Sequence, residues 1–296
     1  MYILHYRKFF YIISGALVAG SFLAILMWGI PLGIDFKGGS LLEIEYVNTR
    51  PDIQIIKSRI ASLDLGNVLI QETGERGILL RAKEITEEVH QEVLVTLSDK
   101  GKEPISEKRF TSIGPVIGKE LQEKALISIV LVVILIIVYI AFTFRHVSKP
   151  INSWTYGLIA VLALVHDVTI PTGVFAFLGK FSTGEVDTLF VTALLTILGL
   201  SVNDSIVVFD RIRENLRLRI GKTFEETVGI SLRQTITRSI NTSLTIIIVL
   251  FAIYFFGPES TKHFSLVLII GLIVGAYSSI FIASPLLVDI AKRLKK

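Results

Sequence analysis

The chain has 296 residues, of which 51% are hydrophobic and only 19% are charged, and its formal net charge is +4. Soluble domains carry about a quarter charged residues, so this composition argues against a purely soluble protein. The sequence contains no cysteine, which excludes disulfides, thiolate zinc sites, iron–sulfur clusters and cysteine nucleophiles.

Six apolar stretches are long enough to cross a bilayer as helices, which takes about 20 residues each. They are Phe9–Ile30, Ala125–Phe144, Trp154–Leu178, Thr188–Phe209, Ser239–Phe256 and Phe264–Ile290. Because backbone polar groups in lipid must bond within their own segment, we expect six transmembrane helices. The first stretch is too long for a typical signal peptide and is followed by no small-residue cleavage site, so we expect residues 1–30 to form an uncleaved anchor.

Basic residues gather on one side of the expected helices, near both chain ends and in two of the loops. They are Arg7, Lys8, Arg145, Lys149, Arg211, Arg213, Arg217, Arg219, Lys222, Arg233, Arg238, Lys292, Arg293, Lys295 and Lys296. The two short loops on the other side hold one each, Lys180 and Lys262. By the positive-inside rule, we expect both termini and the basic loop 210–238 to be cytoplasmic.

Residues 31–120 are less apolar and slightly acidic, and we expect them to fold outside the membrane on the far side. The expected elements are a strand at 40–47, a helix at 51–62, strands at 67–72 and 77–82, a helix at 86–97 and a strand at 108–113. The order βαββαβ is that of a ferredoxin-like α+β domain. We therefore expect this domain to precede a five-helix bundle over residues 121–296. It holds one histidine, His90, and no catalytic constellation.

The segment Asp210–Arg233 is basic and amphipathic. Ile212, Leu216, Ile220 and Phe224 recur at about helical period, with arginines between them. One interpretation is a helix lying on the anionic inner leaflet, and another is a docking face for a second protein. A nucleic-acid surface is not expected, because the stripe is short and has no interleaved aromatic residues.

Polar residues within the fourth and fifth spans point to a site at membrane depth. An ionisable side chain there costs about 2.5–3.5 kcal/mol on insertion scales, so it needs a reason. Asn203 and Asp204 lie in the fourth span, and Asp204 is interpreted as a proton or ion site or as a packing contact. Arg238, Asn241 and Thr242 share a face at the start of the fifth span. Arg238 is either a headgroup anchor or a partner of Asp204.

A third polar feature is the pair His166 and Asp167, near the middle of the third span. A lone histidine there is commonly a packing residue, but the adjacent aspartate favours a polar interior seam. Their side chains point about 100° apart, so they cannot face one site equally.

Motifs for several enzyme classes are missing. The chain has no Walker A sequence, no His-Glu-x-x-His helix and no Gly-x-Ser-x-Gly elbow. Asp167 and Asp204 are a poor candidate for an aspartyl protease dyad, because no glycine flanks either residue. We therefore expect no enzyme activity, no cofactor and no metal centre.

Several segments resemble the SecD/SecF family of protein-export membrane subunits. Asp35, Phe36, Gly38 and Gly39 resemble its Asp-Phe-x-Gly-Gly signature, and Gly114-Pro115 begins a stretch similar to its second signature. Leu198–Asn215 and Arg238–Ser243 are similar to the family's fourth span and the start of its fifth. The order of one span, an outer domain and five spans also agrees, and the small outer domain favours the SecF branch over the SecD branch.

The resemblance implies one half of a pseudo-symmetric unit in the resistance–nodulation–division superfamily, with SecD as the other half. It implies use of the proton motive force to help preproteins leave the SecYEG channel, with proton-coupling roles at Asp204 and Arg238. SecA and YajC are further candidate partners, and the membrane is the bacterial cytoplasmic (inner) membrane. Two alternatives stay open: half of a proton-coupled small-molecule exporter, and a translocase assembly factor that conducts no protons.

Overall fold

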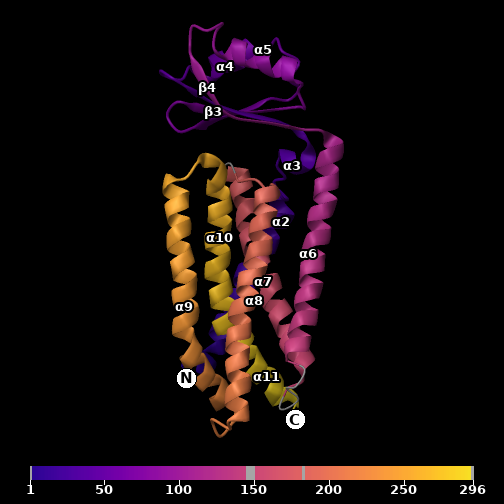
Figure 1. Ribbon diagram of the computed structural model, residues 1–296, viewed down its shortest axis with the longest axis vertical. Coiled ribbons are helices and arrows are strands. Elements are labelled where there is room, and N and C mark those ends of the chain that lie inside the picture. Colours follow the sequence, from indigo (N-terminus) through magenta and orange to yellow (C-terminus); the bar gives the residue numbers. More distant parts are fainter. Residues whose placement is uncertain (1, 145–150, 182–183, 295–296) are drawn as a thin grey trace. The chain divides into compact units, whose positions relative to one another are not determined.

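The computed structural model describes residues 2–144, 151–181 and 184–294, and it divides into two compact units (Figure 1). One unit is Leu32–Leu126, and the other combines Met1–Pro31 with Ile127–Lys296. Four basic residues that entered the orientation argument, Arg145, Lys149, Lys295 and Lys296, lie outside the described residues.

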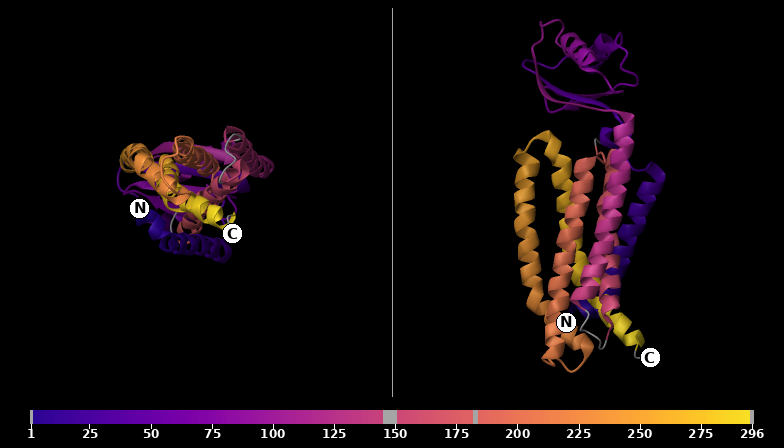
Figure 2. Two further views of the ribbon diagram at one scale, coloured as in Figure 1. Left: turned by 90° about the horizontal axis from the view of Figure 1, so that it is seen from below. Right: turned by 45° about the vertical axis from the view of Figure 1, so that its right-hand side comes forward.

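Six helical segments are long and apolar enough to cross a membrane, which confirms the expected class of fold. Their elements are α2 (Arg7–Trp28), α6 (Pro115–Thr143), α7 (Ser153–Phe181), α8 (Thr188–Arg217), α9 (Phe224–Phe256) and α10 (Glu259–Ser278), the last continued by a π-helical turn η1 (Ser279–Ala283) and α11 (Ser284–Leu294). Figure 2 shows α7–α11 running lengthwise as one bundle. Helices α7, α8 and α10 with α11 are the most buried, whereas α2, α6 and α9 lie at the periphery.

The bundle is held by apolar packing and by close helix approaches at small residues. Tyr156 on α7 and Phe209 on α8 pack edge to face at 5.4 Å between ring centroids, and both are fully buried. A Cβ atom on Gly271 of α10 would lie 2.1 Å from Cδ1 of Ile197 on α8, so a larger residue there would displace the Ile197 side chain. These contacts fix the relative positions of the central helices.

The expected cytoplasmic loop 210–238 is mostly helical in the structure. Helix α8 continues to Arg217 and α9 begins at Phe224, which leaves only a short turn at 218–223. Ile212 is fully buried and Leu216 and Phe224 pack against the same core. The apolar stripe therefore covers the bundle's own core, and the expectation that it forms a separate helix on the lipid surface is wrong.

The unit Leu32–Leu126 has the expected ferredoxin-like arrangement. After a single helical turn α3 (Ile34–Lys37), its elements are β1 (Gly39–Tyr46), α4 (Ile53–Ile60), β2 (Leu69–Thr73), β3 (Gly77–Ala82), α5 (Glu87–Leu97) and β4 (Ile105–Ile113). The strand order is β2-β3-β1-β4, with all three pairings antiparallel. One face of the sheet places Leu42 opposite Leu80 and Ile44 opposite Ile78, and these side chains pack in one core with Ile56, Val93 and Leu97 of the two helices.

Candidate functional site

Asp204 lies near the middle of α8, because that helix runs on to Arg217 beyond the expected span. Its carboxyl is half-buried, and Oδ2 accepts a hydrogen bond from Oγ of Ser243 on α9 at 3.4 Å. The helices α8 and α9 contact each other directly. The structure thus places the expected carboxyl at the α8–α9 interface.

Arg238 is exposed on α9, five residues before Ser243. Among the described residues no ion pair joins its guanidinium to the Asp204 carboxylate. Arg238 lines a cavity of about 320 Å³ that also includes Asp210, Arg211 and Gln234. The two expected proton-coupling residues therefore share an interface but do not contact each other in this arrangement.

The other expected polar residues on α8 and α9 lie on an exposed face of the bundle. Asn203, Asn241 and Thr242 are all exposed. The Thr242 hydroxyl donates to the carbonyl of Arg238 at 2.9 Å, which satisfies it within its own helix. Neither asparagine lies in the bundle core, so this polar face is directed away from it.

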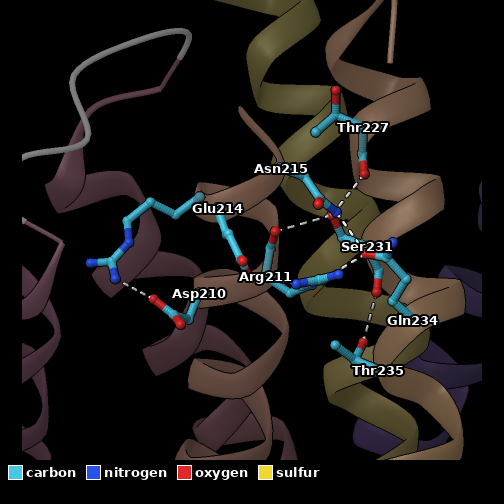
Figure 3. A network of polar contacts seen from close by, with 9 residues as sticks. Asp210, Arg211, Glu214, Asn215, Thr227, Ser231, Gln234 and Thr235 are labelled. Atoms are coloured by element: carbon cyan, nitrogen blue, oxygen red, sulfur yellow. Dashed lines mark hydrogen bonds and ion pairs between the residues drawn. The ribbon is translucent and has the colours of Figure 1, made fainter. Parts of the chain in front are cut away.

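A polar network joins the end of α8 to the start of α9 (Figure 3). Nδ2 of Asn215 donates to Oγ of Ser231 at 2.8 Å and to Oε1 of Gln234 at 2.9 Å, and Nε of Arg211 donates to the same Gln234 oxygen at 2.6 Å. Asn215 and Ser231 are fully buried. These bonds fix the two helix ends together next to the cavity that contains Arg238.

His166 and Asp167 are both buried on α7. The structure brings Asp167 together with two serines that the sequence argument did not identify, Ser201 on α8 and Ser278 on α10, and it does not join the pair to Asp204. Ser201 lies three residues before Asp204, so the two share a face of the predicted helix. That spacing was the signal in the sequence that could have identified Ser201 as a member of a polar site. Ser278 follows Gly271 and Gly275 in the sequence, and small residues at this spacing indicate close packing as readily as hydrogen bonding.

The two signature segments pack against each other in the unit Leu32–Leu126. Gly38 and Gly39 have φ angles of 76° and 125°. A Cβ on Gly38 would lie 2.8 Å from Cα of Pro115, and a Cβ on Gly118 would lie 2.9 Å from the nitrogen of Gly38. Phe36 is buried beside them, and Gly114 lies next to the Glu84 carboxylate. In this unit Gly38 and Gly118 mark a close approach of the backbone, whereas Asp35 heads α3 as its acidic first-turn residue.

Comparisons with known families match most of the chain. Residues 93–293 match the family described as Protein export membrane protein SecD/SecF, C-terminal. Residues 29–49 match the SecD/SecF GG Motif family. The second match covers Gly39 and Gly38, the latter packed on Pro115.

Similar proteins include the protein translocase subunit SecF of Thermobaculum terrenum, 42% identical over 97% of this chain and 93% of that protein. The SecF subunit of Anaerolinea thermophila is 38% identical over 97% and 92%. The crystal structure of SecDF from Thermus thermophilus, a translocon-associated membrane protein, superposes with a TM-score of 0.85 at 28% identity. That match covers 99% of this chain but only 39% of the SecDF chain. The chain, a multi-pass membrane protein, therefore belongs to the SecD/SecF family of protein-export membrane proteins.

Proposed function

We propose that the chain is a SecF-type subunit that, together with SecD, uses the proton motive force to help preproteins complete translocation through SecYEG. The observation that carries this proposal is a carboxyl and a guanidinium, Asp204 and Arg238, on neighbouring helices of a bundle related to SecF proteins. Ionisable groups at that depth are costly and commonly mark proton pathways. The proposed activity needs no covalent chemistry.

The exposed polar face of α8 and α9 supports a second, SecD half. Its members are Thr192, Thr196, Asn203, Arg238, Asn241, Thr242 and Thr245. Four of them are threonines whose hydroxyls donate to carbonyls four residues earlier. Within the described part of the chain, no such bond satisfies the two asparagine amides or the guanidinium. Against lipid those groups are unfavourable, whereas a second polar helix bundle supplies partners. The SecDF relative is long enough to contain such a half, since this chain spans 39% of it.

The proton cycle we propose alternates between two partners of Asp204. When protonated, the carboxyl is neutral and the Ser243 hydroxyl suffices to hold it, as in the arrangement described above. When ionised, it attracts Arg238, and charge-assisted hydrogen bonds then draw α8 and α9 into a different packing. Each charge that crosses 100 mV supplies about 2.3 kcal/mol, which shifts a two-state equilibrium about fifty-fold.

The orientation and setting belong to the same proposal. Both termini and the α8–α9 turn face the cytoplasm of a bacterium, because the basic residues concentrate at those ends. The similarity to SecF proteins supports the inner membrane as the chain's location. SecA and YajC are further partners in this scheme. The client is a preprotein, and nucleic acid has no role.

Proton flux through co-reconstituted SecD and this chain tests the proposal. Asp204→Asn keeps the shape of the side chain but removes its titration, so we expect flux and proton-dependent export to be lost while assembly with SecD persists. Arg238→Gln is expected to lower flux by about ten- to a hundred-fold, since a neutral amide binds the carboxylate more weakly than a guanidinium.

Matched controls use the same substitutions at exposed positions. Asp64→Asn removes a carboxylate of the unit Leu32–Leu126 that pairs with Lys83. Arg217→Gln removes an exposed guanidinium at the end of α8. Both are expected to retain flux. Normal export by Asp204→Asn would exclude Asp204 from the mechanism, and flux absent from the unmodified pair would favour an assembly factor.

A further inference from the structure

The buried carboxyl of Asp167 on α7 has hydrogen-bond partners on three helices. Asp167 is 0% exposed, and its Oδ1 lies 2.9 Å from Nδ1 of His166. Its Oδ2 accepts a hydrogen bond from Oγ of Ser278 on α10 at 2.8 Å and a short one from Oγ of Ser201 on α8. Two serine hydroxyls therefore donate to the same carboxyl oxygen of Asp167. The proposed role of Asp204 does not use this group.

The other ring nitrogen of His166 has no hydrogen-bond partner in the described part of the chain. The side chain is only 5% exposed, and it lines a cavity of about 340 Å³ between α2, α7, η1 and α11. Apart from His166, the polar lining of that cavity consists of Tyr11 and Ser14 on α2. A buried polar atom without a partner costs about 1–3 kcal/mol, so its presence calls for an explanation.

Together these two observations assign the positions of the protons. An ionised carboxylate can only accept, so Nδ1 of His166 carries the hydrogen that lies toward Asp167. The lone pair of the neutral imidazole is then on Nε2, which is buried and has no hydrogen-bond partner among the described residues. In this state the pair has a net charge of −1 inside the bundle, which is costly at membrane depth.

We propose that His166 and Asp167 form a second proton-binding site, at which Nε2 of His166 takes up a proton from water that enters the cavity. The proton adds to the lone pair, no other bond forms or breaks, and the product is an imidazolium–carboxylate pair with zero net charge. The adjoining cavity is lined mostly by apolar side chains, and its two hydroxyls, on Tyr11 and Ser14, already bond Asp289 and Tyr277.

Other titratable groups around His166 and Asp167 are on α10, α2, α11 and α8. Tyr277 on α10 lies over the imidazole at 6.4 Å between centroids, and its hydroxyl donates to the carbonyl of Phe10. On α2 the Tyr11 hydroxyl donates to Asp289 of α11 at 3.1 Å, and Asp289 pairs with Arg7. On α8 the nearest titratable side chain along the helix is Asp204, three residues beyond Ser201. The two proton sites are thus on different helices, although Ser201, which bonds Asp167, is on the same helix as Asp204.

Nitrogen-15 NMR of histidine-labelled full-length chain in lipid nanodiscs tests the proposal, because the ring shifts report both charge and tautomer. The chain has five histidines, and magnetisation transfer from labelled aspartate carboxyls identifies His166 in the unmodified protein. We expect His166 to be neutral with hydrogen on Nδ1 at high pH and to become an imidazolium when the pH is lowered. His166→Gln should remove this signal, and His263→Gln, the same change elsewhere in the bundle, should preserve it.

Two further variants separate this site from Asp204. In Asp167→Asn the imidazolium loses its counter-charge, so His166 should stay neutral across the range. In Asp204→Asn the titration of His166 should persist, whatever happens to proton flux. The proposal is overturned if His166 stays neutral in the unmodified chain, carries its hydrogen on Nε2, titrates unchanged in Asp167→Asn, or stops titrating in Asp204→Asn.

Discussion

At the scale of single residues, Gly38 shows two separate requirements at one position. Its φ of 76° disfavours any side chain, and a Cβ there would also overlap Cα of Pro115 at 2.8 Å. Gly74, in the turn between β2 and β3, has a φ of 58° but open space around it. A comparison of substitutions at Gly38 and Gly74 therefore separates the cost of backbone strain from the cost of steric overlap.

Gly38→Ala is therefore expected to lower the free energy of unfolding of the unit Leu32–Leu126 by several kcal/mol, because strain and overpacking add. Gly74→Ala should cost only about 1–2 kcal/mol, since it carries the strain alone. Proteolysis of the full chain at increasing denaturant measures both. Equal effects of the two variants would show that the contact with Pro115 is unimportant.

A second residue-scale prediction concerns pH. Two hydrogen bonds from Arg59, at 2.6 and 3.1 Å, hold the pKa of Glu103 below its ordinary value of 4.5. The folded state thus binds this proton less readily than the unfolded state, so the contribution to stability is present above pH 4.5 and is lost as the pH falls through the lowered pKa. It is worth less than about 1 kcal/mol, because the pair is partly solvated.

Hydrogen exchange in the loop between α5 and β4 measures this effect, since the amides of Lys100 and Glu103 bond carbonyls there. After correction for intrinsic rates, protection should decrease below pH 4.5 in the unmodified chain. In Glu103→Gln protection should be lower at neutral pH and vary less with pH. A variant with the same pH profile as the unmodified chain would contradict this assignment.

The sequence could identify Asp204 and the pair His166 and Asp167 because an ionisable residue inside an apolar span is conspicuous by itself. It could not give their partners. Whether Arg238 reaches Asp204 depends on side-chain direction across two helices, and the structure instead gives Asp204 the Ser243 hydroxyl. The 100° offset expected for His166 and Asp167 has a counterpart in the structure, where Asp167 bonds toward α8 and α10 and His166 lines a cavity beside α2.

At the scale of elements, the sequence pattern gave a wrong prediction at the end of α8 and the start of α9. Ile212 and Leu216 form an apolar stripe among arginines, and such a stripe suits a membrane surface or a protein core equally well. The decision depends on α9 being present to pack against, which is tertiary information. The buried bonds of Asn215 to Ser231 and Gln234 then stabilise the helical extension.

We expect Asn215→Ala to destabilise the bundle by about 1–3 kcal/mol, because it removes two hydrogen bonds and leaves a small void. Glu214→Ala, its exposed neighbour, should cost less than about 1 kcal/mol. Loss of helical circular dichroism in mixed micelles of increasing SDS content measures both. If both variants unfold at the same SDS fraction, the bonds of Asn215 drawn in Figure 3 do not hold the two helix ends together.

At the scale of the whole molecule, span lengths and the βαββαβ order were enough to predict the fold class, because bilayer thickness and strand pairing leave few solutions. The periodicity of the sequence could not predict that α8 and α9 expose a polar face. One polar residue per turn is equally compatible with a helix inside the bundle. The exposed positions of Asn203 and Asn241 make a second half necessary to the proposal.

The absence of cysteine makes this proposal testable with single thiols. Asn203→Cys and Asn241→Cys should react readily with a thiol reagent in the isolated chain in detergent, and more slowly once SecD is present. Leu135→Cys, exposed on the apolar α6, serves as the control and should react equally in both samples. Unchanged rates at both asparagine positions would place the SecD contact elsewhere.

The π-helical turn Ser279–Ala283 inserts one extra residue between α10 and α11, and the Ser284 hydroxyl donates to the Ser279 carbonyl at 2.9 Å within it. Each residue advances an α-helix by about 100°, so every side chain beyond the insertion is rotated by that angle from where a regular helix would place it. This phase offset turns Asp289 toward Tyr11 and Arg7. One surplus peptide unit in the last span thus determines which face of the C-terminal helix meets the first.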